Sequence, residues 1–152
     1  MEKFLEYLQK SEKIIKTIDH MTYVTFPLIK DKKILLKILL ETKTAITNCI
    51  NSVLQYEYLY KRIDLYKNPK TNLRTFVEKC ASRYRITQKE ISLILELFEI
   101  EEKHKQSSME FFKDGKIVIL SENMKTDAIK IEKIKEFLDT AKSVLMKIKK
   151  KF

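Results

Sequence analysis

The chain has 152 residues, with 31 Lys and Arg against 21 Asp and Glu for a net charge of +10, and it contains one Gly, two Pro and two Cys. One glycine excludes Gly-rich phosphate loops, the dinucleotide-binding fingerprint and the nucleophile elbow, because each of these motifs needs several glycines. The length suits a single domain, and no apolar run approaches the ~20 residues of a membrane span, so we expect no membrane segment.

Helical periodicity covers the first half of the chain. Residues 2–22 predict an amphipathic helix, and residues 31–66 predict a second, unusually long one. Between them, residues 22–29 predict a turn, because Pro27 disfavours helix in the residue before it.

Two shorter helices follow the breaker Asn68-Pro69-Lys70. Asn72 or Thr71 can cap the first of them, and Thr87-Gln-Lys-Glu90 is a capping box that opens the second. Residues 91–100 are apolar nearly all round, which predicts that this second helix is the most buried element.

The only glycine marks a β-hairpin. Asp114-Gly115 supplies the positive φ of a two-residue type I′ turn, and β-forming residues on both sides predict strands near 109–113 and 116–120. A last helix is predicted over about 130–150. The fold expected for residues 1–152 is mainly α: a single-domain helical bundle of about five helices with one β-hairpin (about 109–120) before the last helix.

Arginine is the informative part of the basic charge. Only four of the 31 basic residues are arginine, and an abundance of lysine is also what codon bias in an AT-rich genome produces. Three of the four lie within residues 74–85, where their planar forks could hold phosphate. We therefore predict a nucleic-acid-binding surface made of Arg74, Lys79, Arg83, Arg85, Lys89, Lys147, Lys149, Lys150 and Lys151. The alternative, in which these arginines pair with Glu99 or Glu102 of an acidic segment, stays open.

Four tyrosines near the end of the long helix are a second feature of interest. Tyr56, Tyr58, Tyr60 and Tyr66 are interleaved with basic residues and could stack on single-stranded bases. On a helix, Tyr56 and Tyr60 share one face and Tyr58 lies on another, so part of the set is expected in the core.

The sequence offers little catalytic chemistry. Cys49 and Cys80 lie on apolar helical stripes, which predicts core packing and a reducing, cytoplasmic compartment. His20 and His104 are the only histidines, and we predict neither a metal site nor a cofactor. An enzyme with a pocket around His104 and Glu101 is the third of three hypotheses, and no substrate suggests itself.

His104 extends a core-facing stripe at the end of its helix. One interpretation is a half-buried histidine that terminates the helix, with its charge favoured by the helix dipole. The other is a polar pocket at the helix–hairpin junction, formed by Glu101, His104, Ser107 and Ser108.

The layout of residues 2–105, two long antiparallel helices and then two shorter ones with a His at the end of the fourth, resembles the HEPN-type helical domain. Active members of that family carry Arg, four to six residues, then His as an RNA-cleaving pair. Here that place reads Glu99-Ile-Glu-Glu-Lys-His104, and neither histidine has an arginine at that distance. The resemblance thus implies a non-catalytic bundle that works near nucleic acid or as a dimerising partner.

The leading hypothesis is a non-enzymatic helical protein that binds nucleic acid, RNA in particular, through its basic surface. The alternative is a protein–protein interaction module, or a homodimeric HEPN-like adaptor that pairs through its hairpin or long helices. In that case an acidic protein surface could be the partner, because the chain is basic.

Overall fold

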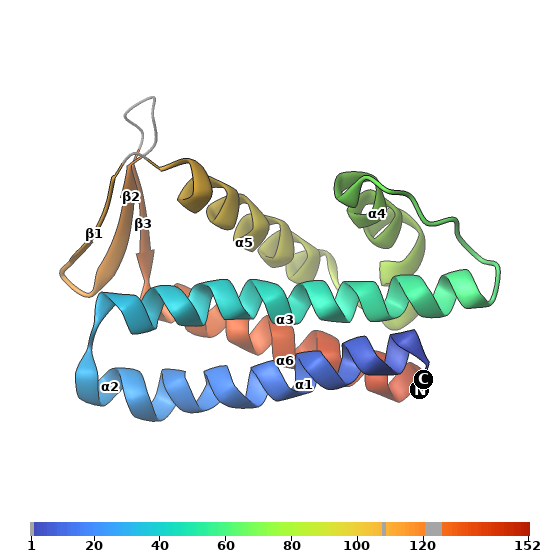
Figure 1. Cartoon of the computed structure of the whole chain (residues 1–152), viewed down its shortest axis with the longest axis horizontal. Coiled ribbons are helices and arrows are strands. Elements are labelled where there is room, and N and C mark those ends of the chain that lie inside the picture. Colours follow the sequence, from blue (N-terminus) through green and yellow to red (C-terminus); the bar gives the residue numbers. More distant parts are fainter. Residues whose placement is uncertain (1, 108, 121–125) are drawn as a thin grey trace.

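Three long helices form the body of the protein. The computed structural model describes residues 2–107, 109–120 and 126–152. Helix α1 (Lys3–His20) lies antiparallel to α3 (Lys32–Leu59), and α6 (Ile131–Lys151) packs against both (Figure 1). Helix α5 (Gln88–Gln106) contacts α3 and α6 and completes the bundle. The mainly α, single-domain prediction is confirmed.

The core follows the helical periodicity of the sequence. Apolar residues spaced three or four apart on α1, α3 and α6 are fully buried, among them Ile18, Leu39, Ile46, Phe137 and Leu138. Helix α5 is not the most buried element, contrary to expectation, because it buries one face and leaves Leu95 in solvent. Within the described residues, no helix has the length and hydropathy needed to cross a membrane.

The connection between α1 and α3 is helical, so the predicted turn over 22–29 is wrong. A π-helical turn (Met21–Thr25) leads into the short helix α2 (Phe26–Ile29). Pro27 is tolerated because it stands in the first turn of α2, where a backbone N–H is not needed. The chain reverses only at Lys30, which is left-handed with φ 55°.

The second predicted helix is also shorter than expected, since α3 ends at Leu59. Lys61 adopts a left-handed conformation with φ 60°, and the backbone N–H of Arg62 donates to the carbonyl of Glu57 at 2.9 Å. This is a helix C-terminal reversal of the kind that usually employs glycine.

Helix α4 (Pro69–Thr75) is capped by Asn68, whose side chain accepts from the backbone of Lys70 at 2.8 Å. Neither Asn72 nor Thr71 is therefore the cap; the Asn72 side chain instead bonds the backbone of Tyr66. A π-helical turn (Phe76–Cys80) and a 3-10 turn (Ala81–Tyr84) follow. The capping box at the start of α5 is confirmed, with Thr87 and Glu90 bonding each other's backbone.

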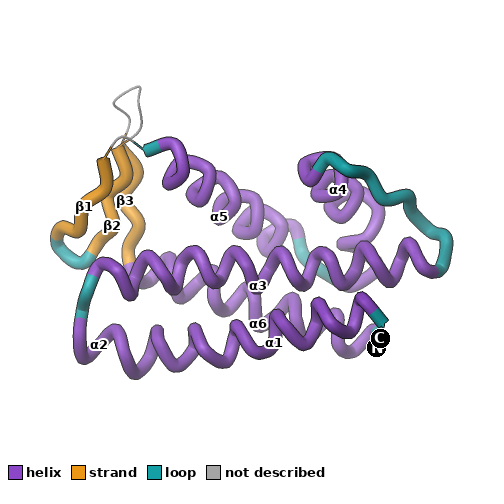
Figure 2. The backbone as a smooth tube through the Cα atoms, viewed as in Figure 1, coloured by secondary structure: helices purple, strands orange, loops and turns teal. Residues whose placement is uncertain are grey.

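The hairpin forms where the sequence predicts it. Strands β1 (Met109–Lys113) and β2 (Lys116–Leu120) pair in antiparallel fashion around Asp114 and Gly115, both with positive φ. A third strand, β3 (Thr126–Lys130), pairs with β2 and was not predicted, because it is short and continues directly into α6. The sheet, of order β1-β2-β3, lies at the end of the bundle opposite the two termini (Figure 2).

Candidate nucleic-acid interface

A basic groove lies where the last turn of α6 meets the connection that enters α5. It encloses about 430 Å³, and its lining residues are Arg83, Tyr84, Arg85, Lys147, Lys150 and Lys151. Five of the six are basic, and among the described residues none that lines the groove is acidic. The structure thus joins two arginines and three lysines that are more than sixty positions apart in the sequence.

The local backbone conformation exposes the side chains of Arg83 and Arg85 to solvent. Arg85 adopts a left-handed conformation with φ 59° at the end of the 3-10 turn, and Thr87 then caps α5. The chain therefore makes a sharp corner at 83–86, which leaves Arg83 and Arg85 exposed while Tyr84 points inward. Lys147 fixes the opposite wall by donating to the carbonyl of Arg85 at 2.9 Å and to the carboxylate of Glu90.

The groove residues differ in how much of their charge is already compensated. Lys147 is paired with Glu90, and Arg83 is paired with Glu57. Within the described part of the chain, Arg85, Lys150 and Lys151 form no ion pair and are exposed. These three side chains are free to meet an anion from solution.

A buried carboxylate stands beside the groove. Glu57, on the last turns of α3, is 1% exposed and accepts from Arg62 Nη1 at 2.7 Å and from Arg83 Nε at 3.0 Å. The alternative expectation, that the arginines pair with Glu99 or Glu102, is therefore wrong. Arg83 pairs with Glu57, and Glu99 pairs with Lys103. Sequence reasoning missed Glu57 because one Glu in an apolar helix stripe gives no sign that it is buried.

Tyr84 lies under the groove with its hydroxyl buried and without a hydrogen-bond partner among the described residues. Burial and the nearby charge of Glu57 raise the pKa of Tyr84 well above its ordinary value. Its ring packs edge-on against Phe152, which stacks on Tyr56. This aromatic cluster holds the last turn of α6 against the end of α3.

The remaining predicted basic residues lie outside the groove. Lys149 turns toward α1 and pairs with Glu12 at 2.9 Å. Lys79 lines a neighbouring cleft with Arg62. Arg74 and Lys89 are exposed on α4 and on the first turn of α5, and they line neither space.

The described residues of the predicted pocket at the helix–hairpin junction have different partners. His104 Nδ1 binds the carboxylate of Glu110 on β1 at 2.7 Å, and the Ser107 hydroxyl donates to the His104 carbonyl at 3.0 Å. Glu101 instead pairs with Lys43 at 3.0 Å and with Lys105 at 2.9 Å. Ser108 lies outside the described residues. His104 thus links the end of α5 to β1, as a helix-terminating residue would.

A cleft of mixed charge lies at the far end of α6. It encloses about 550 Å³ between α5, β3 and the start of α6, and its charged lining residues are five acids and three lysines: Glu96, Glu99, Asp127, Glu132, Glu136, Lys103, Lys130 and Lys133. Lys103 pairs with Glu99 and Asp127, and Lys133 pairs with Glu96. Because a helix rises 1.5 Å per residue, the span from Glu136 to Lys150 separates the two spaces by roughly 20 Å. The mixed-charge cleft thus lies toward the sheet, whereas the basic groove lies at the end of the bundle that carries the termini (Figure 1).

Cys49 and Cys80 are buried free thiols, as predicted for core positions. The described residues hold no cluster of three His, Cys, Asp or Glu side chains that could bind a metal ion.

No protein-family model, curated protein or solved structure matches this chain. The HEPN-type resemblance therefore stays a prediction from the helical layout.

Proposed function

We propose that this protein is a non-enzymatic nucleic-acid-binding protein that holds phosphates in the basic groove formed by Arg83, Arg85, Lys147, Lys150 and Lys151. The observation that supports the proposal is the convergence of five cations on one concave surface, three of them without an acidic partner among the described residues. Binding there would release counterions from the polyanion, which is the main source of sequence-independent affinity.

Arginine and lysine would play different roles. The guanidinium of Arg85 can hold two phosphate oxygens at once, whereas Lys150 and Lys151 act as point charges. The cleft at the other end of α6 has five acids beside its three lysines, so it offers a polyanion less positive charge than the groove does. RNA is proposed as the polymer from the HEPN-like layout, and the cytoplasm as the compartment from the free thiols.

The test is the salt dependence of binding. Affinity for a fluorescent 20-nucleotide RNA is measured by anisotropy between 50 and 300 mM KCl for the wild type and for Lys150→Gln/Lys151→Gln. Each phosphate contact contributes about 0.7 to the slope of log affinity against log salt for a single strand, so losing two contacts lowers the slope by about 1.4.

The matched control is Lys33→Gln/Lys37→Gln, which removes the same charge from two exposed lysines near the start of α3. This control is expected to keep the wild-type slope. A salt-independent wild type, or two double variants that behave alike, would show that the groove does not bind phosphate.

A homodimer is the second candidate, and the edge of the sheet favours it. In the described sheet, β1 has a neighbour on one side only, and Met109 and Phe111 are exposed on it. Such an edge can pair with a second chain, although Lys32 already donates to the carbonyl of Glu110 at 2.9 Å. Light scattering tests this: a dimer that Phe111→Lys converts to a monomer supports it, and a monomeric wild type rejects it.

A further inference from the structure

A second cleft, larger than the basic groove, lies near it. It encloses about 1050 Å³ between the start of α1, the end of α3 and the π-helical turn at 76–80. Its lining combines four cations with two acids and with apolar side chains: Lys3, Lys61, Arg62, Lys79, Glu2, Asp64, Phe4, Leu5, Tyr58, Leu59, Ile63 and Gln55. The cleft therefore differs from the groove, because it offers an exposed aromatic ring as well as charge, whereas the ring of Tyr84 in the groove is buried.

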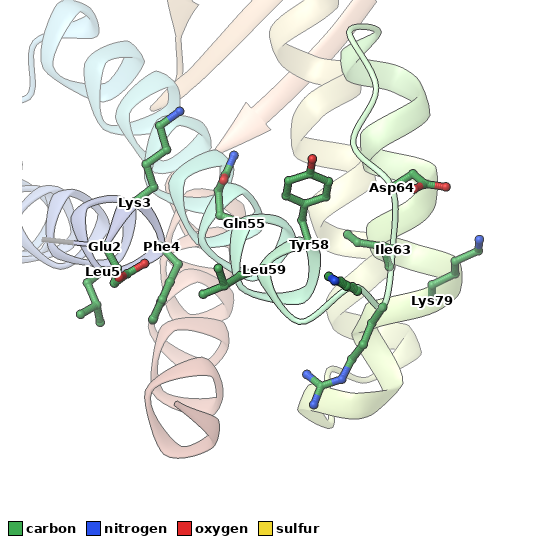
Figure 3. Close-up of a pocket in the computed structure, with 12 residues that line it drawn as sticks. Glu2, Lys3, Phe4, Leu5, Gln55, Tyr58, Leu59, Ile63, Asp64 and Lys79 are labelled. Atoms are coloured by element: carbon green, nitrogen blue, oxygen red, sulfur yellow. The ribbon is translucent and has the colours of Figure 1, made fainter.

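Tyr58 is the aromatic side chain available to a ligand in this cleft. It is 51% exposed, and no ring contact or hydrogen bond occupies it among the described residues. Figure 3 shows its ring standing between the end of α3 and the segment that carries Ile63 and Asp64. By contrast, Tyr56 packs on Phe152, and the ring of Tyr60 is covered by the guanidinium of Arg62 at 5.2 Å.

Glu57 connects the cleft to the groove. One carboxylate oxygen binds Arg62, which lines the cleft, and the other binds Arg83, which lines the groove. The two guanidinium groups are thus held side by side by a single buried anchor. Arg62 and Arg83 therefore link the basic lining of the cleft, which includes Lys79, to that of the groove, which includes Arg85 and Lys150.

We infer that the nucleic acid bound by this protein is single-stranded, with an unpaired base stacked on Tyr58 while the adjoining phosphates follow Arg62 and Arg83 into the groove. This inference rests on the proposed function. Only an unpaired strand can place a base face against a ring, and stacking is tolerant of sequence because every base has a π-face. Duplex RNA would present phosphates to the groove but no base to Tyr58.

The test replaces the aromatic ring with an aliphatic side chain. Tyr58→Leu is compared with Tyr58→Phe and with Tyr23→Leu, a control at the sheet end of α1 that is 47% exposed and also lies near lysines. The probes are a single-stranded RNA that carries 2-aminopurine, whose fluorescence falls on stacking, and a duplex of the same sequence.

Stacking predicts that Tyr58→Leu weakens single-strand binding about five- to a hundredfold and abolishes the 2-aminopurine quench. Its salt slope stays at the wild-type value, because no ionic contact is lost. Tyr58→Phe and Tyr23→Leu are expected to bind as the wild type does, and duplex affinity does not change with Tyr58→Leu.

The outcomes separate the two proposals. Equal affinity of the wild type for duplex and single-stranded RNA, or an unchanged 2-aminopurine quench in Tyr58→Leu, overturns the single-strand inference. The proposal that the groove binds phosphates in a salt-dependent way is not affected by either result. A wild type that binds neither probe in a salt-dependent way overturns the proposed function itself.

Discussion

The buried carboxylate of Glu57 gives the sharpest stability prediction. Glu57→Gln keeps the size of the side chain but removes its charge and one of its two acceptor oxygens. One charge-assisted hydrogen bond is lost outright, at a cost of about 1.5–3 kcal/mol, and the other becomes weaker. The two arginines are 39% and 43% exposed, so they can regain water and add no buried unpaired charge. The net loss expected is about 2–3 kcal/mol.

Urea unfolding followed by circular dichroism measures this loss. With a slope of about 2 kcal/mol per molar urea, the midpoint is expected to fall by about 1–1.5 M. Glu12→Gln is the matched control, because Glu12 is 36% exposed and its surface pair with Lys149 is worth about 1 kcal/mol at most. The double variant Glu57→Gln/Arg83→Gln should cost less than the sum of the single variants, since both remove the same contact. Equal midpoints for Glu57→Gln and Glu12→Gln would refute the claim that the buried pair stabilises the fold.

Three further predictions concern the capping box, an acid-sensitive ion pair and the thiols. Thr87→Ala is expected to lower the unfolding free energy by about 1 kcal/mol in a urea titration, because it removes the N-cap of α5. An unchanged unfolding free energy would show that this cap does not stabilise α5. Burial opposes ionisation of Glu101, but hydrogen bonds from Lys105 and Lys43 outweigh it and hold its pKa below the ordinary 4.5. The stability that its charge contributes is therefore complete above pH 4.5 and is lost as the pH falls through the pKa of the folded state. Glu101→Gln should make the unfolding free energy less sensitive to acid. Identical plots of unfolding free energy against pH for the variant and the wild type would contradict this. Burial raises the pKa of the thiols of Cys49 to about 12 and Cys80 to about 11, so neither should react with a disulfide reagent at pH 8 until urea is added. Rapid labelling of the folded protein would be inconsistent with that burial.

Features coded by a few neighbouring residues were predictable. Asp114-Gly115 located the hairpin, and Thr87 with Glu90 located the start of α5, because a turn or a cap depends on side chains within three or four positions. The same local reasoning failed at Pro27, which can end a helix or begin one, and only the packing around α2 decides which.

Features that depend on distant residues were not predictable. The sequence suggested that Arg83 and Arg85 could act with Lys150 and Lys151, but only the fold shows that they line one groove while Lys149, one position away, faces α1. A helix turns by about 100° per residue, so neighbouring lysines point in different directions. The burial of Glu57 depends on α3, the 3-10 turn and the 60–68 segment together, and no short motif encodes it.

The meeting of the two chain ends beside the candidate interface has a practical consequence. The two ends lie side by side (Figure 1). Phe4 and Phe152 are in ring contact at 5.1 Å, Lys3 lines the cleft, and Lys151 lines the groove. An affinity tag or fluorescent protein fused to either end would emerge next to the residues under test and could crowd out a ligand. Exposed Lys113, next to the hairpin turn at the other end of the bundle, is a better place for a label. Gly115 itself should stay glycine, because its φ of 74° would strain any side chain.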